Sequence, residues 1–329
     1  MAKWEILNID PWIKDYEDDI NLRMSEYEKA KNRLLGDGQT LSDFANAHHY
    51  YGFHKTKTGW IYREWAPNAD GLYLIGDFND WDRHAHPMKK INDEDWEISI
   101  KGIKTIPHGS RLKVLVDANG KIYDRIPLFA KRVERDENGD FAAIMYNPRS
   151  KFKWSDSDFK IKNEDLLIYE AHIGMAGEEG KVSTYKEFEK NILPKIKKAG
   201  YNTVQLMAIA EHPYYGSFGY QVSNFYAPSS WYGEINDLKS LVNTAHKLGL
   251  NVIMDLVHSH AVKNTIEGIN EFDGTDYQFF HTGTKGEHPD WDSKLFDYAK
   301  PGVAHFLLSN VKYWLEEFHF DGFRFDGVT

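Results

Sequence analysis

The chain has 329 residues, enough for two domains that each bury a core. Its 50 acidic and 40 basic residues give a formal charge of −10, which disfavours nucleic acid as a partner, and the absence of cysteine excludes disulfides, thiol catalysis and cysteine-ligated metals. The amino terminus lacks an apolar signal core and no run of about 18 apolar residues occurs, so we expect a cytoplasmic protein without a membrane partner. Aromatic residues make up 15% of the chain and can stack on sugars, which favours a carbohydrate ligand.

Residues 1–48 are predicted to form a helical segment. Between about Pro11 and Leu35, hydrophobic residues recur at near-helical spacing among charged ones. Asp10 stands where it can cap the start of this helix, and the glycines at 36 and 38 would end it. We therefore expect one helix over residues 11–35.

Residues 49–150 are predicted to form a β-sandwich. Between Gly59 and Ile126 the hydrophobic period changes to two, and clusters of Asn, Asp, Gly and Pro separate the apolar runs. These runs cover residues 60–62, 72–75, 96–100 and 111–116. The first domain is therefore expected to be all-β, behind a helical prefix.

Residues 151–329 show a different pattern, which begins after a polar stretch at 149–164 that resembles a linker. Apolar strands alternate with amphipathic helices, and the first of these helices opens with a capping box from Thr184 to Glu187 and closes at Gly200. The predicted strands are residues 166–169, 203–207 and 251–257 and a Phe-rich strand within the terminal stretch 320–329. Four such repeats predict parallel pairing, either in the first half of a (β/α)₈ barrel or in a doubly wound sheet.

The polar residues favour the barrel. The glycine-rich phosphate loop of nucleotide-binding folds is missing after the first strand. Polar side chains instead gather just after the strand ends, where a barrel enzyme places its site. They are Glu170, His172, Glu211, Tyr220, Asp255, His260, Arg324 and Asp326.

The last strand places a cation and a carboxylate on one face. Side chains alternate along a strand, so Phe323 and Phe325 should face a hydrophobic layer while Arg324 and Asp326 share the opposite side. Arg324 would then keep Asp326 ionised, as a nucleophile that attacks a sugar acetal carbon must be. A purely structural Arg–Asp pair is the alternative.

The segment from Asp255 to His260 allows three interpretations. His258 and His260 could face the same way and bind a divalent metal, as in barrel hydrolases. A histidine could also simply cap a loop. In the third interpretation, Asp255 and His260 bind the hydroxyls of a sugar whose anomeric carbon lies near Asp326.

Two tryptophans of the first domain lie in or next to polar loops. Trp65 ends a strand in the run Glu64–Pro67, and Trp81 closes the turn-rich run that begins at Gly76. Both could pack in the core, but the polar surroundings of Trp81 make it the better platform for a sugar.

Residues 255–260 and 322–329 resemble the first and second signature regions of the α-amylase superfamily, glycoside hydrolase family 13, as its eukaryotic-type glycogen branching enzymes carry them. The runs at 64–67 and 76–79 resemble the glycan-binding module that precedes the barrel in those enzymes. Further matches lie at 169–174, 206–209, 217–222, 272–276, 291–293 and 314–317. The resemblance implies an immunoglobulin-like, early-set glycan-binding sandwich followed by the first half of a (β/α)₈ barrel.

The resemblance also implies an activity and a set of residue roles. The activity would be a retaining transglycosylation in glycogen biosynthesis, cleaving α-1,4 and forming α-1,6 links in an α-glucan, with no cofactor. By resemblance Asp326 is the nucleophile, and Tyr220, Asp255, His260 and Arg324 hold the sugar. The glucan contacts of the front module would be Trp65, Ala66, Pro67, Trp81 and Lys113. Ser259 replaces a calcium-associated Asn of many amylases, so no metal is expected.

The general acid/base of the family is a Glu after the fifth strand, and a second essential Asp follows the seventh, whereas four strands are predicted here. A retaining enzyme needs its second carboxyl group about 5–5.5 Å from the nucleophile. Glu211 lies on the correct rim but on the wrong strand. We therefore expect the 329-residue chain to lack branching activity. The alternatives are an amylase-type or debranching hydrolase and a non-catalytic glucan-binding protein.

Overall fold

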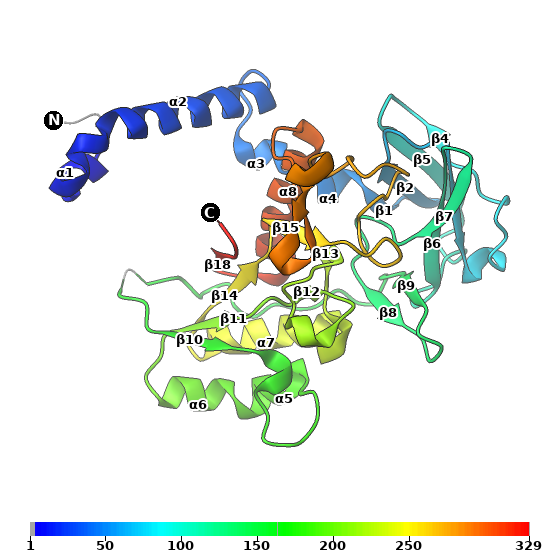
Figure 1. The fold of residues 1–329 in the computed structure, drawn as a ribbon. Helices are drawn as coiled ribbons and strands as arrows, with labels where there is room; N and C mark the ends of the chain where they lie inside the picture. The colour runs from blue at the N-terminus through cyan, green and yellow to red at the C-terminus, as the bar shows by residue number, and fades with distance from the viewer. Residues whose placement is uncertain (1–3, 163, 329) are drawn as a thin grey trace. The chain divides into compact units, whose positions relative to one another are not determined.

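The computed structural model describes residues 4–162 and 164–328, and the chain divides into two compact units, Met1–Asn46 and Ala47–Thr329. The first unit is helical (Figure 1). It consists of α1 (Ile6–Ile9), the 3₁₀ segment η1 (Pro11–Tyr16), α2 (Glu17–Leu34) and α3 (Leu41–Phe44). Asp10 does cap η1, accepting a hydrogen bond from the Trp12 amide at 3.0 Å. The predicted single helix is wrong over residues 11–16, because the backbone of Tyr16 (φ −105°, ψ 19°) separates the 3₁₀ turns from α2.

The second unit begins with two antiparallel sheets, which confirms the predicted sandwich (Figure 1). The short helix α4 (Ala47–Tyr50) leads into the first sheet. That sheet is ordered β1 (Gly52–Lys55), β2 (Gly59–Trp65), β5 (Asp95–Lys101), β4 (Lys89–Lys90). The other is ordered β3 (Gly71–Gly76), β6 (Arg111–Ala118), β9 (Phe141–Ile144), β8 (Val133–Arg135), and β7 (Lys121–Arg125) pairs with β6. Side chains that alternate inward along these strands, such as Tyr62, Leu74 and Val114, are fully buried between the sheets.

The other half of this unit is built on four parallel strands, which confirms the predicted half barrel. Their order is β10 (Ile168–Ala171), β11 (Thr203–Leu206), β14 (Asn251–Leu256), β18 (Gly322–Phe325). The helices between them are α5 (Tyr185–Asn191), α6 (Leu193–Lys198), α7 (Ile235–Lys247) and α8 (Pro301–Phe318). Strand order follows chain order, as expected for successive βα units.

Short strands extend the loops at the carboxyl ends of β11 and β14. The loop after β11 contains a two-stranded antiparallel ribbon, and the loop after β14 contains a three-stranded antiparallel sheet. The ribbon consists of β12 (Ala210–Glu211) and β13 (Asn224–Pro228), and the small sheet of β15 (His260–Val262), β17 (Ser293–Leu295) and β16 (Glu287–His288). These loops rise on the rim where barrel enzymes place their sites.

Two predicted boundaries in the half barrel are wrong. The helix that begins at the Thr184–Glu187 capping box does not run unbroken to Gly200, since Pro194 cannot donate a backbone hydrogen bond and the chain restarts as α6. The first strand starts at Ile168 rather than residue 166, because its parallel register begins with the pair Ile168 and Thr203. Leu166 and Leu167 precede the strand and are about half exposed.

The stretch predicted as a linker is fastened to the half barrel. The Trp154 ring stacks on His319 with centroids 3.8 Å apart, and Asp156 accepts hydrogen bonds from His246 (2.8 Å) and His319 (2.9 Å). The sandwich also touches the half barrel, since the Trp65 and Phe279 rings meet edge to face at 5.1 Å. Residues 47–329 thus form one compact unit, and a domain boundary near residue 150 stays a prediction.

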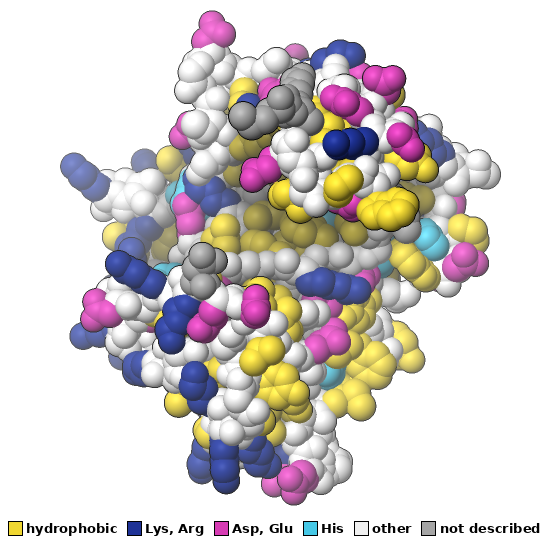
Figure 2. Space-filling view, turned by 90° about the vertical axis from the view of Figure 1, so that its left-hand side faces the viewer, with side chains coloured by type: hydrophobic (Ala, Val, Ile, Leu, Met, Phe, Trp, Pro, Cys, Tyr) yellow, Lys and Arg dark blue, Asp and Glu magenta, His cyan; other side chains and the backbone are white. Residues whose placement is uncertain are grey.

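Hydrophobic side chains on the face in Figure 2 are interspersed with acidic and basic ones. Among residues 4–162 and 164–328, no helix is both long and apolar enough to cross a membrane.

Candidate active site

Each of the four parallel strands contributes one polar side chain to a single hydrogen-bonded row. Gln205 on β11 donates to Glu170 on β10 (3.2 Å) and to Asp255 on β14 (2.8 Å). Arg324 on β18 donates to Asp255 at 3.1 Å and to Asp326 at 2.5 Å. The row therefore links Glu170, Gln205, Asp255, Arg324 and Asp326 across the sheet. Because the strands are parallel, these residues lie toward the same end of the half barrel.

Asp255 is the centre of this row. Its side chain is fully buried and accepts hydrogen bonds from Gln205, Arg324 and the Tyr220 hydroxyl, the last at 2.7 Å. Burial raises the pKa of Asp255, while Tyr220 and Arg324 offset part of that effect. Burial and the neighbouring carboxylate raise the pKa of Tyr220, so its hydroxyl stays protonated and donates. The arrangement fixes one carboxylate by three donors in a dry environment.

Asp326 lies at the accessible end of the row. Its side chain is 21% exposed, and its backbone amide donates to the Leu256 carbonyl at 2.9 Å. The predicted alternation along β18 is confirmed, since Arg324 and Asp326 share one face and the rings of Phe323 and Phe325 lie 6.3 Å apart on the other. A groove of about 670 Å³, lined by Asp326, the β14–β15 turn and α8, keeps one side of the carboxylate open.

The expectation that Phe325 faces a hydrophobic layer is wrong. Phe323 packs against the core, but the Phe325 side chain is 44% exposed. The reason is its place on β18, which pairs with β14 alone among the strands of residues 4–162 and 164–328, so that the Phe325 ring lines the open groove beside α8.

The two histidines after β14 turn to different partners. His260 donates through Nε2 to the Tyr220 carbonyl (2.8 Å) and accepts at Nδ1 from the Ser259 hydroxyl (2.9 Å). Burial lowers the pKa of His260, consistent with a neutral ring in this tautomer. His258 instead bonds to Asn310 of α8 at 2.9 Å. The two rings do not converge on one point, and His260 connects to Asp255 through Tyr220.

Glu211 is not available as an acid near Asp326. It is 1% exposed, and its two oxygens accept hydrogen bonds from the backbone amides of His212 (3.1 Å) and Ser230 (2.7 Å). Burial raises the pKa of Glu211 to about 7. This carboxyl group therefore fixes the β12–β13 loop.

The five residues proposed for the front module fall into two places. Trp65 and Ala66 are buried, and Pro67 is half-buried with its carbonyl bonded to Lys90. Their side chains lie near the half barrel, where the Trp65 indole packs on Phe279.

Trp81 and Lys113 lie elsewhere on the sandwich and are joined by a polar network. Asp77 accepts from the Trp81 indole (3.1 Å) and the Arg111 amide (2.7 Å), while Asp140 pairs with Arg111 (3.3 Å) and Lys113 (2.7 Å). Trp81 is partly exposed in a left-handed backbone conformation (φ 59°), which presents the indole at a turn. Lys113, by contrast, is largely buried.

Gln205 is the residue that sequence reasoning missed. It occupies an inward position between Val204 and Leu206, both buried, in the β11 strand. One polar side chain in a short apolar strand was the available signal, because burial of an amide requires partners. The partners could not be predicted, since Glu170 and Asp255 lie 35 and 50 residues away in the sequence.

Two family models match parts of the second unit. The family described as carbohydrate-binding module 48 (isoamylase N-terminal domain) matches residues 50–130, and alpha amylase, catalytic domain, matches residues 190–297. Among solved structures, a putative alpha amylase from Salmonella typhimurium (23% identity, TM-score 0.68) aligns over 84% of this chain and 43% of its own. An apo pullulanase from Paenibacillus barengoltzii (19% identity, TM-score 0.69) aligns over 88% of this chain and 50% of its own. These structures share the fold.

Closer similarity is found to proteins named 1,4-alpha-glucan-branching enzyme. The one from Rhizophagus irregularis is 47% identical over 98% of this chain and 48% of its own length, and that of Dictyostelium discoideum 44% over 99% and 49%. A chloroplastic/amyloplastic form from Arabidopsis thaliana is 46% identical over 99% of this chain and 41% of its own length. The chain spans about half the length of the curated relatives it matches. Over nearly its whole length the chain is therefore similar to about half of a branching enzyme, with matches to a carbohydrate-binding module and to the catalytic domain of the alpha amylases.

Proposed function

We propose that this chain contributes the glucan-binding module and half of the active site of a 1,4-α-glucan branching enzyme. The observation that supports this most strongly is the row from Asp255 through Arg324 to Asp326, which places a buried and an accessible carboxylate around one guanidinium. The identity of 44–48% to branching enzymes over nearly the whole chain supports the same activity.

In the proposed reaction, the Asp326 carboxylate attacks the anomeric carbon of an α-1,4-linked glucose residue, and the glycosidic oxygen leaves with a proton from a second carboxyl group. The 6-hydroxyl of another chain then opens the glucosyl ester and gives its proton to that second carboxylate, which forms the α-1,6 bond and frees Asp326. Arg324 donates a charge-assisted hydrogen bond to the nucleophile and fixes its direction.

The remaining residues bind and orient the sugar at the cleavage point. Asp255 is the hydroxyl acceptor, and Tyr220 and Gln205 hold it in place. His260 positions Tyr220 through its carbonyl. Protonation of the leaving oxygen requires a second carboxyl group about 5–5.5 Å from Asp326, and Glu211 is enclosed by amides instead.

For the front module, we propose that Trp81 is the main sugar platform and that Lys113, Trp65, Ala66 and Pro67 contribute further glucan contacts. The partly exposed indole at a turn supports Trp81. The burial of Trp65 and Ala66 limits them to contacts at the junction with the half barrel. The proposed location is the cytoplasm, although one relative is chloroplastic or amyloplastic.

The function is tested by incubating amylose with the full-length protein that contains these residues. Branching lowers iodine staining without releasing reducing ends, and isoamylase treatment afterwards liberates short chains. Release of reducing ends in proportion to the staining loss would instead show a hydrolase of the kind found among its structural neighbours. Tight glucan binding with no change in staining would show a non-catalytic binding protein.

A further inference from the structure

A second groove lies between the sandwich and the half barrel, and it shares no lining residue with the row around Asp255. It has a volume of about 620 Å³, within the usual range for small-ligand sites. Its walls come from β1, the start of β2, the segment at 146–154, Lys131, Lys239 of α7 and the last turn of α8.

Positive side chains predominate in this groove, whereas the whole chain has a negative net charge. Five lysine and arginine side chains line it beside two carboxylates, although the protein has a net charge of −10. Both carboxylates are engaged, since Glu317 pairs with Lys239, and Glu316 accepts from His48 and His49 at 3.0 Å each. The other four cations have no ion-pair partner among residues 4–162 and 164–328. They are Lys55, Lys131, Arg149 and Lys151.

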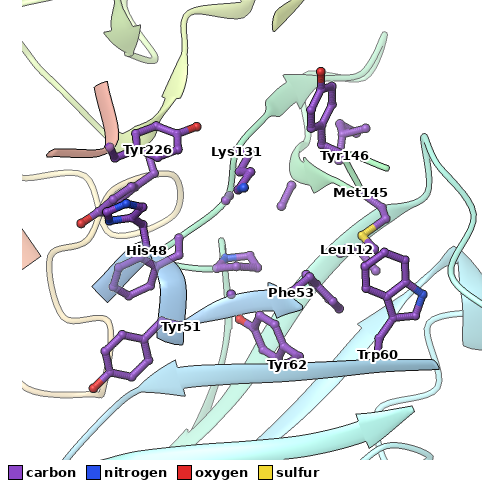
Figure 3. Close-up of a pocket in the computed structure, with 17 residues that line it drawn as sticks. His48, Tyr51, Phe53, Trp60, Tyr62, Leu112, Lys131, Met145, Tyr146 and Tyr226 are labelled. Carbon is purple, nitrogen blue, oxygen red and sulfur yellow. The ribbon is translucent and has the colours of Figure 1, made fainter. Parts of the chain in front are cut away.

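Lys131 distinguishes this groove from an ordinary patch of surface lysines. Its side chain is half-buried, and burial lowers the pKa of its ammonium group. It lines both the groove and an adjoining enclosed cavity of about 70 Å³. Figure 3 shows Lys131 among the rings of that cavity, with Tyr226 and His48 on one side and Trp60 on the other. The nearest counter-charge to Lys131 is Glu317, which is already paired with Lys239, so an anion that enters here gains a cation that makes no ion pair of its own.

The same groove offers aromatic surface for the ring of a sugar. Phe53, Trp60, Tyr146, Phe152 and Trp154 all line it. One face of Trp154 is occupied by His319, and the Phe152 ring meets its edge at 4.9 Å, which holds both rings in place. Rings fixed beside cations suit a ligand that has both an apolar sugar face and a negative charge.

We propose that this groove binds the phosphomonoester of a hexose. The phosphate lies against Lys131, Arg149 and Lys151, which supply charge-assisted hydrogen bonds, and the hexose ring rests on the aromatic wall. The groove is too small for a polyanion to lie along it, and the acidic chain disfavours nucleic acid. The groove is separate from the proposed branching centre, so the test of phosphate binding does not depend on the proposed branching activity.

The test is calorimetric titration of the chain with glucose 6-phosphate, with glucose and inorganic phosphate as paired ligands. We expect saturable binding of glucose 6-phosphate, at least tenfold tighter than either part alone. Lys131→Met should weaken binding at least tenfold. Arg149→Ala, at an exposed position that leaves the fold unaffected, should weaken it severalfold, and Lys104→Ala, exposed outside the groove, should leave it unchanged.

Two arms distinguish the sources of such a phosphate. Tighter binding of a 6-phosphorylated maltooligosaccharide identifies a phosphate borne on a glucan, and tighter binding of the free ester identifies a soluble sugar phosphate. Either result supports the site. Equal affinity for glucose 6-phosphate and inorganic phosphate, or binding that Arg149→Ala and Lys131→Met leave unchanged, would overturn it.

Discussion

Replacing His246 by leucine should destabilise the unit of residues 47–329 by about 3 kcal/mol. The imidazole is 2% exposed and bonds to Asp156 at 2.8 Å and to Asp321 at 3.0 Å, and those two carboxylates are 5% and 11% exposed. Removing one partner of a buried charge network costs about 3–5 kcal/mol. The low end applies because Asp156 keeps His319 (2.9 Å) and Asp321 keeps the Val252 amide (2.7 Å).

Thermal unfolding measures this loss. A change of about 3 kcal/mol in a unit of this size lowers the melting temperature by roughly 6–12 °C. His84→Leu, at an exposed position on the sandwich, is the matched control and should shift it by no more than 1–2 °C. If His246→Leu melts within 2 °C of the parent, the network contributes no net stability and the reasoning is refuted.

The same network predicts a pH dependence. Burial alone would lower the pKa of His246, but Asp321 and Asp156 outweigh it and raise the pKa above its ordinary 6.5. A raised histidine pKa stabilises the fold fully below 6.5, and that contribution is lost as pH rises through the folded-state pKa. The parent should therefore lose more stability between pH 6 and pH 9 than His246→Leu. Equal losses would show that His246 is not charged in the folded state.

Three further predictions concern the candidate sites. Trp81→Ala should weaken maltooligosaccharide binding about tenfold in calorimetry without lowering the melting temperature, and a large loss of stability would assign Trp81 to the core instead. Tyr220→Phe removes the 2.7 Å donor to Asp255 and should reduce kcat/KM of the full-length enzyme about tenfold, and an unchanged value would remove Tyr220 from the site. Burial raises the pKa of Glu211 to about 7, so the folded state binds the extra proton and stability should fall by roughly 3 kcal/mol as pH rises from 4.5 to 7. Glu211→Gln should flatten that slope in denaturant titrations, and an unaltered slope would contradict the assignment.

Much of the half barrel could be predicted because its signals are local. The hydrophobic pattern changes from a period of two to an alternation of apolar strands and amphipathic helices, which indicates parallel pairing. The position of polar residues at strand ends identifies Asp255, Arg324 and Asp326. The helix break at Pro194 is equally local, but the regular apolar face on both sides of it predicted one continuous helix.

The rest depends on contacts between residues far apart in the sequence. The sequence around Asp156 is typical of a charged linker. It does not indicate that Asp156 bonds to His246, 90 residues away, and to His319, 163 residues away. Trp65 lies beside a polar turn in the sequence, but Phe279 covers its ring and Gly302 leaves the space that it fills, since a Cβ there would lie 2.3 Å from the indole. Period and composition do not contain this information, because it arises only when the two halves pack together.

The role of Asp326 is tested most directly by trapping the glucosyl-enzyme. A fluorinated glucosyl fluoride slows release of the covalent intermediate, so the full-length protein can be digested and its labelled peptide sequenced by mass spectrometry. We predict a single glucosyl ester on Asp326, absent from Asp326→Asn, which should still bind glucan but retain less than a few per cent of branching activity. A label on Asp255 or another carboxylate, or substantial activity in Asp326→Asn, would contradict the assignment of Asp326 as the nucleophile.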